Sequence, residues 1–374
     1  MFGRWFLPGT TVAVTVAGLL AAPSSATAAP QGHGHGHKPT AVVSLGDSYI
    51  SGEGARWKGN SADPAPGHQG TDRGPAVYGD TVANGCHRSD VAEIVSARLP
   101  VRKSINLACS GARTVNVLRA SAGGVAFKGE APQNDQLATV ARANDVKLVV
   151  LSIGGNDLGF SSIVGACVAA YLYGTPPCST SQQAGVDARL PGVAAAVTAT
   201  VQDVRATMAA AGYAARDYRF VLQSYPNSIP AAGKNRYSGT APDARASVGG
   251  CPFLDVDADW SRDSLSPALT GMLAGVAEGT GVQFLDLSGA FRGHELCAAT
   301  ARQSTGRPRS ATSEWFRFVD LAGQGDSAES LHPNYFGQKA LGRCLALAML
   351  TPRSVGCRAV PGLPTWAVHL VKRH

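Results

Sequence analysis

Five short apolar runs, rich in β-branched residues, recur along the chain, and each is closed by glycine, serine, asparagine or proline. Such runs are typical of strands buried on both faces of a parallel sheet. Apolar residues at three- and four-residue steps predict helices over 185–212, 266–281 and 334–350. Strands that alternate with helices predict a doubly wound α/β fold of three layers. The five runs are TAVVSLGDS (40–48), KSINLACSGA (103–112), KLVVLSIGGND (147–157), YRFVLQSYPN (218–227) and VQFLDLSGAF (282–291).

The first residues of the chain predict export. Residues 1–28 carry a basic residue, a short apolar run and then small residues, which is the layout of a secretory signal peptide. Residues 29–39 are rich in Gly and His and are expected to form a disordered spacer, although its three histidines could bind a transition-metal ion. We interpret residues 40–352 as one domain and residues 353–374 as a C-terminal tail on the surface. The sequence therefore predicts a secreted, extracellular protein.

The number and spacing of the cysteines also support the prediction of an exported protein. The chain has eight cysteines, none in a C-x-x-C metal spacing, and an even number in an exported chain predicts disulfides. A free, nucleophilic cysteine is the alternative. We expect each cysteine to bond its nearest neighbour in sequence, because each bridge then closes one local excursion of the chain. The expected pairs are Cys86 with Cys109, Cys167 with Cys178, Cys251 with Cys297, and Cys344 with Cys357.

Charge and ligand spacing argue against several classes of function. The formal net charge is +7, but lysine and arginine are scattered without a block of like charges, so nucleic-acid binding is not expected. The mild positive charge is compatible with transient contact to an anionic lipid or membrane surface. A metal-dependent hydrolase is disfavoured because no paired His or Asp ligand spacing occurs outside the spacer. We expect a monomer.

In an open parallel sheet, reactive groups gather at the carboxyl ends of the strands. The first run ends at Ser48, the second brings Gly111 and the third Asn156, while His332 lies just before the last helix. A serine hydroxyl needs a base to become a nucleophile, and histidine is the usual base. The backbone N–H groups of Ser48 and Gly111 and the Asn156 amide can donate to an oxyanion. Each piece alone also fits an ordinary turn or helix cap, so the prediction depends on their coincidence.

The four blocks GDS at Ser48, CSGA at Gly111, GGND at Asn156 and LHPN at His332 occur in this order. With them the chain resembles the SGNH (GDSL-type) hydrolase family over about residues 40–350. The cysteine pairing and the strand end SYPN look similar to secreted actinobacterial lipases and esterases. The resemblance implies a flavodoxin-like three-layer α/β/α fold with a five-stranded parallel sheet and no cofactor. It also implies Ser48 as nucleophile, His332 as general base and then acid, and Ser48, Gly111 and Asn156 as oxyanion-hole donors.

Two residues depart from the pattern of that family. Tyr49 stands where the family usually has Leu, which is expected to affect the acyl or alcohol pocket. Glu329 stands where the family usually has the Asp that orients the histidine. Glu329 can complete a Ser-His-Glu triad, or the imidazole of His332 can instead be oriented by a main-chain carbonyl of Glu329 or Ser330. Asp326 is a third candidate for this role.

Three other residues near the motifs have expected roles outside proton transfer. Asp47 is expected to hold the turn at the end of the first strand through hydrogen bonds. Glu53 could form an ion pair with Arg56 or Arg88, and such a structural role is favoured over a contact with substrate. Tyr225 either borders the site or packs as an ordinary aromatic residue.

The sequence thus predicts a secreted serine carboxylic ester hydrolase that acts through an acyl-enzyme. Its expected partners are small-molecule or lipid esters, including phospholipids. A polysaccharide O-deacetylase is the alternative enzyme, because the same groups would serve small acetyl esters. A catalytically inactive binding protein with the same fold is the alternative of another class, and the intact set of four blocks argues against it.

Overall fold

The computed structural model describes residues 38–60, 71–239, 243–303, 307–321 and 323–373. The expected signal peptide and the three spacer histidines lie outside the described residues. Among the described residues, no helix is both long enough and apolar enough to cross a bilayer.

One sheet of seven strands organises the fold, in the order β2-β1-β3-β4-β5-β6-β7. Neighbours from β2 through β6 are parallel, and β7 is antiparallel to β6. The two central strands β1 and β3 are buried along nearly their whole length, as their β-branched composition predicts. The strands are β1 (Thr40–Gly46), β2 (Lys103–Asn106), β3 (Asp145–Ser152), β4 (Arg219–Gln223), β5 (Gln283–Asp286), β6 (Val355–Arg358) and β7 (His369–Lys372).

The prediction of a five-stranded, all-parallel sheet is wrong. The two additional strands, β6 and β7, come from residues 353–374, which the sequence analysis treated as a surface tail. Both are four-residue strands at the sheet edge, and their charged ends remain exposed. They therefore lack the continuous apolar run that marks a strand buried on both faces.

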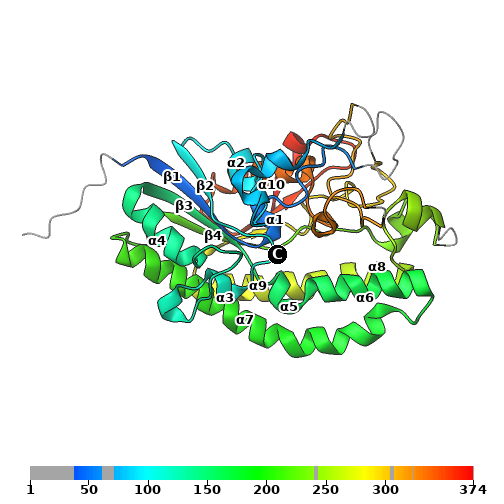
Figure 1. Ribbon diagram of the computed structural model, residues 1–374, viewed down its shortest axis with the longest axis horizontal. Coiled ribbons are helices and arrows are strands. Elements are labelled where there is room, and N and C mark those ends of the chain that lie inside the picture. Colours follow the sequence, from blue (N-terminus) through cyan, green and yellow to red (C-terminus); the bar gives the residue numbers. More distant parts are fainter. Residues whose placement is uncertain (1–37, 61–70, 240–242, 304–306, 322, 374) are drawn as a thin grey trace, which may run out of the picture. The chain divides into compact units, whose positions relative to one another are not determined.

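Helices cover both faces of the sheet (Figure 1). On one face lie α2 (Glu93–Ser96) and α10 (Tyr335–Ala348), and on the other lie α4 (Gln133–Ala143), α7 (Cys178–Ala210) and α9 (Ser266–Thr280). The predicted three-layer α/β/α arrangement is therefore confirmed.

The three predicted helices are present, and the first of them is longer than its periodic pattern. Residues 185–212 form only the later part of α7, which begins at Cys178 and continues through Pro191. The expected helices over 266–281 and 334–350 correspond to α9 and α10. The remaining α-helices are α1 (Ser48–Ser51), α3 (Thr114–Val117), α5 (Gly155–Leu158), α6 (Phe160–Tyr173) and α8 (Asp255–Trp260).

Short 3-10 and π-helical turns lie in the connections between these elements. A π-helical turn, Ser261–Leu265, joins α8 to α9, and a 3-10 turn, Ser327–Glu329, precedes α10. The other turns are Pro75–Val82, Ala120–Ala122, Ala232–Lys234 and Thr365–Ala367, which are 3-10, and Ala244–Val248, which is π-helical.

Four disulfides join cysteines that are neighbours in sequence order, and each closes a loop outside the central strands. The last of them ties β6 to α10 and so fastens the added edge of the sheet to the helical layer. Such a bridge restricts the unfolded chain, with a typical effect of about 2–4 kcal/mol. The bonds are Cys86–Cys109, Cys167–Cys178, Cys251–Cys297 and Cys344–Cys357.

Candidate active site

The four residues that the sequence motifs single out line one pocket. Ser48, Gly111, Asn156 and His332 come from segments spread over most of the domain, and all four border the same cavity of about 190 Å³. The cavity lies where β1, β3 and β4 end and where the loop after β2 begins, which is the carboxyl edge expected for an open parallel sheet.

The end of β1 fixes the position of Ser48. Gly46 has a φ of 134°, and a Cβ added to it would lie 1.9 Å from the carbonyl oxygen of Ser152 on β3. Only glycine fits this close approach of two backbones. Asp47 then caps α1, because its carboxylate accepts the N–H of Tyr49 at 3.1 Å. Ser48 is the first residue of that helix, and its backbone N–H has no acceptor within the helix.

The imidazole of His332 contacts the Ser48 hydroxyl directly. His332 Nε2 lies 2.7 Å from Ser48 Oγ, and His332 Nδ1 lies 3.0 Å from the carbonyl oxygen of Ser330. A carbonyl can only accept, so Nδ1 carries the hydrogen and Nε2 presents its lone pair to the serine hydroxyl. Burial lowers the pKa of His332, while the Glu53 charge and the nearby carbonyls partly oppose this shift. The neutral form that a base requires is thereby favoured.

Glu329 does not hold the imidazole in this arrangement. Its carboxylate accepts hydrogen bonds from Trp57 Nε1 at 2.6 Å and from the Tyr78 hydroxyl at 2.7 Å. The side chain is buried, and burial raises the pKa of Glu329 against the lowering effect of these two donors. Asp326 likewise faces its own turn, where it accepts the N–H of Ala328 at 2.9 Å.

The loop that carries His332 is held by side chains from distant segments. Leu331 adopts a left-handed conformation with φ of 56°, which is uncommon for a residue with a branched side chain. Tyr49 donates its hydroxyl to the Leu331 carbonyl at 2.8 Å, and the Tyr49 ring lies 5.0 Å from the His332 ring. After the histidine, Asn334 caps α10 by accepting the N–H of Phe336 at 3.0 Å.

Gly111 and Asn156 are placed at the pocket by different means. Gly111 has a φ of 85°, so the turn after Ser110 requires a residue without a Cβ. Asn156 lies in the first turn of α5 and donates one amide N–H to the Ala112 carbonyl at 2.9 Å. This bond orients the amide, and its NH₂ group carries a second hydrogen for a ligand in the pocket.

A model of the GDSL-like Lipase/Acylhydrolase family matches residues 44–340. The chain belongs to this family. The resemblance drawn from the four sequence blocks is confirmed, and the chain is a serine ester hydrolase.

Two relatives of this chain are lipases of Streptomyces coelicolor. Lipase 1 and Lipase 2 of Streptomyces coelicolor are each 27% identical to it, over 300 and 303 residues. These matches cover 79% and 80% of this chain and 81% and 82% of the two relatives. Phospholipase A1 from Streptomyces albidoflavus shares the fold with a TM-score of 0.54 and 22% identity, over 84% of this chain and 100% of that one.

Behind Ser48, Asp47 and Tyr225 form a hydrogen-bonded pair. The Tyr225 hydroxyl donates to the Asp47 carboxylate at 2.5 Å and accepts the N–H of Gly155 at 3.0 Å. Burial raises the pKa of Asp47 to about 7, despite the opposing hydrogen bond from Tyr225. The pair joins the ends of β1, β3 and β4, so Asp47 holds the turn and Tyr225 also borders the pocket.

The sequence analysis missed a second buried pair near His332. Both carboxylate oxygens of Glu53 lie within 2.9 Å of His87 Nδ1, and this contact raises the pKa of His87. The expected pairing of Glu53 with Arg56 or Arg88 is wrong, because those arginines bind other carboxylates, Asp72 and Glu130 respectively. Glu53 and His87 carry no shared motif in the sequence, so no pattern could have linked them.

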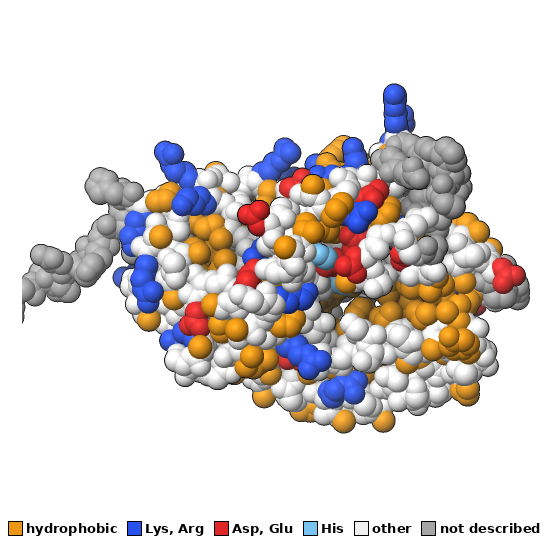
Figure 2. Space-filling view, viewed as in Figure 1, with side chains coloured by type: hydrophobic (Ala, Val, Ile, Leu, Met, Phe, Trp, Pro, Cys, Tyr) orange, Lys and Arg blue, Asp and Glu red, His pale blue; other side chains and the backbone are white. Residues whose placement is uncertain are grey.

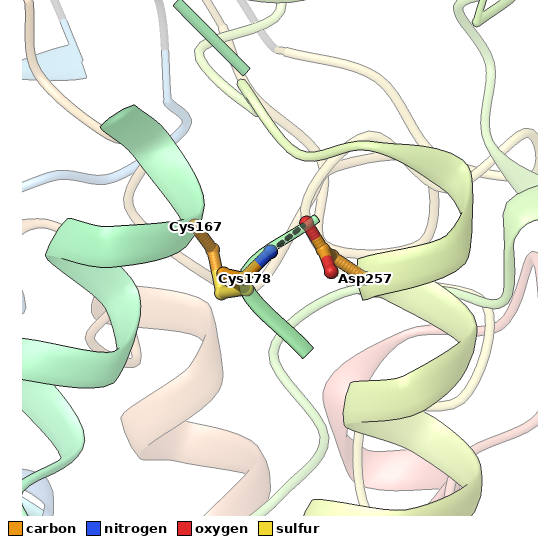
Figure 3. Close-up of side chains that lie close together, drawn as sticks. All are labelled: Cys167, Cys178 and Asp257. Atoms are coloured by element: carbon orange, nitrogen blue, oxygen red, sulfur yellow. Dashed lines mark hydrogen bonds between the residues drawn. A yellow bond between two sulfur atoms is a disulfide. The ribbon is translucent and has the colours of Figure 1, made fainter. Parts of the chain in front are cut away.

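The cluster of Cys167, Cys178 and Asp257 resembles a set of metal ligands, but its contacts are those of a disulfide and a helix cap (Figure 3). Among the described residues, Cys167, Cys178 and Asp257 form a group of potential metal ligands. Their sulfur and carboxylate oxygen atoms all lie within 4.8 Å of one another. The two sulfurs are joined in a disulfide, and Asp257 accepts the N–H groups of Cys178 and Ser179 at 3.1 and 2.9 Å. The carboxylate thus caps the start of α7, and the cluster offers no thiolate to a metal.

The walls of the pocket away from the polar groups are largely apolar. Leu158, Phe160, Leu265 and Leu269 line it beside Ser48. In Figure 2, hydrophobic side chains gather beside a hollow near the middle of the molecule, over α6 and α8. α6 has 14 residues and no charged side chain, although Leu172 and neighbouring residues are exposed.

Proposed function

We propose that this chain is a secreted carboxylic ester hydrolase that acts through an acyl-enzyme on Ser48. The observation that carries the proposal is the 2.7 Å contact between His332 Nε2 and Ser48 Oγ, within a pocket that Gly111 and Asn156 also line. A nucleophile, its base and candidate oxyanion donors in one cavity are the parts that acyl transfer requires. The four disulfides support an extracellular location, because disulfides form and persist in oxidising environments.

In the first half of the reaction, Ser48 Oγ attacks the ester carbonyl carbon and its proton moves to His332 Nε2. The negative charge on the carbonyl oxygen is stabilised by the N–H groups of Ser48, Gly111 and Asn156. The tetrahedral intermediate then breaks its bond to the alcohol oxygen, which takes the proton from Nε2. In the second half, water attacks the acyl-Ser48 carbonyl with Nε2 as base, and the free acid leaves as Ser48 recovers its proton.

In this mechanism the orienting group is the carbonyl of Ser330 rather than the carboxylate of Glu329. The 3.0 Å contact from His332 Nδ1 to Ser330 fixes the tautomer and stabilises the imidazolium that forms during attack. Glu329 serves as a positioning residue, because its two hydrogen bonds tie the turn before Ser330 to Trp57 and Tyr78. We therefore favour a dyad over a triad.

The substrate is an ester with an apolar acyl group. Leu158, Phe160, Leu265 and Leu269 give the pocket an apolar wall, which favours an acyl chain over a sugar. The charge-free α6 beside this wall ends in exposed Leu172 and Tyr173, which suit contact with a lipid surface.

A panel of substrates on the purified mature protein tests this function. Rates are compared on p-nitrophenyl acetate, on p-nitrophenyl esters of longer acyl chains and on acetylated xylan, each with Ser48→Ala as the blank. We expect kcat/KM to be higher on the longer acyl esters than on p-nitrophenyl acetate. On acetylated xylan we expect no activity above the blank. Preference for acetylated xylan would instead favour the polysaccharide O-deacetylase. Inactivity on all of these esters would favour the non-catalytic binding protein.

A further inference from the structure

A second pocket adjoins the active-site pocket at the added edge of the sheet. It has a volume of about 390 Å³ and is bordered by β5, β6 and β7 together with the start of α9. Asn227 and Ser266 line both pockets, and the Ser266 hydroxyl donates to the side-chain oxygen of Asn227. The two pockets therefore share a hydrogen-bonded wall.

Cationic side chains dominate this second pocket. Arg262 reaches it from the turn before α9, Arg358 ends β6, Lys372 ends β7 and Arg373 directly follows it. Asp286, at the end of β5, is its one acidic lining residue. Arg358 and Lys372 lie in β6 and β7 and Arg373 directly follows β7, so the segment beyond the five expected strands supplies three of the four cations.

Two carboxylates, Asp286 and Glu295, lie against the four cations of this pocket among the described residues, so two positive charges are left in excess. Asp286 accepts the Ser224 hydroxyl at 3.2 Å and the Ser288 N–H at 2.9 Å, so its carboxylate is held at the strand end. Within the described part of the chain, Arg358 and Lys372 form no ion pair.

The other two cations of the pocket are partly engaged by neighbouring side chains. Arg262 forms an ion pair with Glu295 at 3.2 Å, and the guanidinium of Arg373 lies over the ring of Phe284, 4.6 Å from its centroid. A stacked guanidinium keeps its charge and its N–H donors, so Arg373 remains able to bind an anion.

One helical turn separates the apolar and the basic surroundings. Within Ser261–Leu265, Ser261 and Leu265 line the active-site pocket, whereas Arg262 lines the second pocket. An ester held at Ser48 therefore has an apolar wall for its acyl group and a cationic recess for the rest of the molecule.

We propose that the second pocket binds the phosphate of the substrate's head group, so that glycerophospholipids are preferred over neutral glycerides. This inference rests on the proposed function. In a glycerophospholipid the phosphate is only a few bonds from the ester carbonyl, so one molecule can occupy both pockets. Guanidinium groups suit phosphate because their planar N–H donors can bind two of its oxygens at once.

The test uses two soluble substrates that differ only in the phosphate head group. Dihexanoyl phosphatidylglycerol and dihexanoyl glycerol are supplied as monomers, so that binding to a lipid surface plays no part. The variant Arg358→Gln/Lys372→Gln removes two cations from the pocket. The matched control Lys103→Gln/Arg216→Gln removes two exposed cations near the amino ends of β2 and β4.

We expect the pocket variant to lower kcat/KM on the phospholipid about tenfold, mainly through KM, and to leave the diacylglycerol unchanged. The control variant should change neither substrate, and the wild-type preference should shrink at high salt. Inorganic phosphate should raise KM for the phospholipid alone. An inorganic phosphate effect on kcat for both esters would indicate a free-anion site and overturn the proposal.

Other outcomes separate failure of this inference from failure of the proposed function. If wild type hydrolyses both esters equally well, or if the pocket variant loses activity on both, the head-group proposal is refuted while the ester hydrolase stands. If wild type hydrolyses neither these esters nor a p-nitrophenyl ester, the proposed function itself fails.

Discussion

Ser48 and His332 share one hydrogen bond, but two different kinds of structure bring them together. Ser48 is placed by backbone geometry, where β1 ends at a glycine that packs against the Ser152 carbonyl of β3. His332 is placed by a loop that contains a left-handed leucine and is tied down by side chains of Tyr49 and Glu329. The strand end is held mainly by the backbone of its neighbouring strand, whereas the histidine loop is held by side chains drawn from far along the chain.

The largest expected effect comes from removing either member of the dyad. His332→Ala should lower kcat on a p-nitrophenyl ester by about 10⁶-fold, because the serine then has no base, and Ser48→Ala should do the same. The double variant should cost no more than either single one, since the two residues act as a unit. Circular dichroism checks that the variants fold, and additive losses would contradict the shared role.

This contrast explains how much of the site could be predicted from sequence. The GDS, CSGA and GGND blocks follow strands that are visible as apolar runs, so their meeting at one sheet edge follows from the fold class. The orientation of His332 could not be predicted, because it depends on whether the side chain of Glu329 turns toward the imidazole or toward Trp57 and Tyr78. That choice is made by tertiary packing between residues more than two hundred and fifty positions apart.

Tertiary packing also limits how much of the fold could be predicted from the sequence. Strands β1 and β3 are buried on both faces, and their sequences show it directly. β6 and β7 are short strands at one end of the sheet with exposed Arg358, His369 and Lys372, so their sequences resemble loops. Their pairing depends on contact with β5 and on the Cys344–Cys357 bridge, neither of which is encoded in a local pattern.

Removing an oxyanion donor on the serine side should have the next largest effect. Asn156→Ala should lower kcat by about 10²–10³-fold with little change in KM, because the amide stabilises charge that appears only in the transition state. Ser161→Ala, at another polar lining residue of the pocket, is the matched control. Equal losses for the two variants would show that Asn156 acts through the shape of the pocket.

On the histidine side, Glu329→Gln should have a much smaller effect on catalysis. We expect kcat/KM to fall by less than about tenfold, whereas loss of a true triad acid costs about 10⁴-fold. The free energy of unfolding should fall by roughly 1–3 kcal/mol, because one buried donor loses its carboxylate acceptor. Asp326→Asn, in the same turn, is the control. A loss near 10⁴-fold for Glu329→Gln would overturn the dyad and restore the triad.

The smallest expected effect is a displacement of the pH profile. Burial lowers the pKa of His332, and the base must be neutral to act, so the acid limb of kcat/KM should lie below the ordinary histidine value of about 6.5. Activity should therefore persist as the pH falls through 6.5 and disappear only at lower pH. Rates on p-nitrophenyl butyrate across this range provide the measurement, and an acid limb above 6.5 would contradict the neutral, buried imidazole.

The most direct test of the account is covalent labelling of the nucleophile. The folded mature protein is treated with a fluorophosphonate, and the adduct is located by mass spectrometry of its peptides. We expect one adduct, on Ser48, which is lost in Ser48→Ala and strongly slowed in His332→Ala. An unlabelled Ser48 in the folded protein, or labelling that proceeds equally fast without His332, would contradict the claim that these two side chains form the catalytic pair.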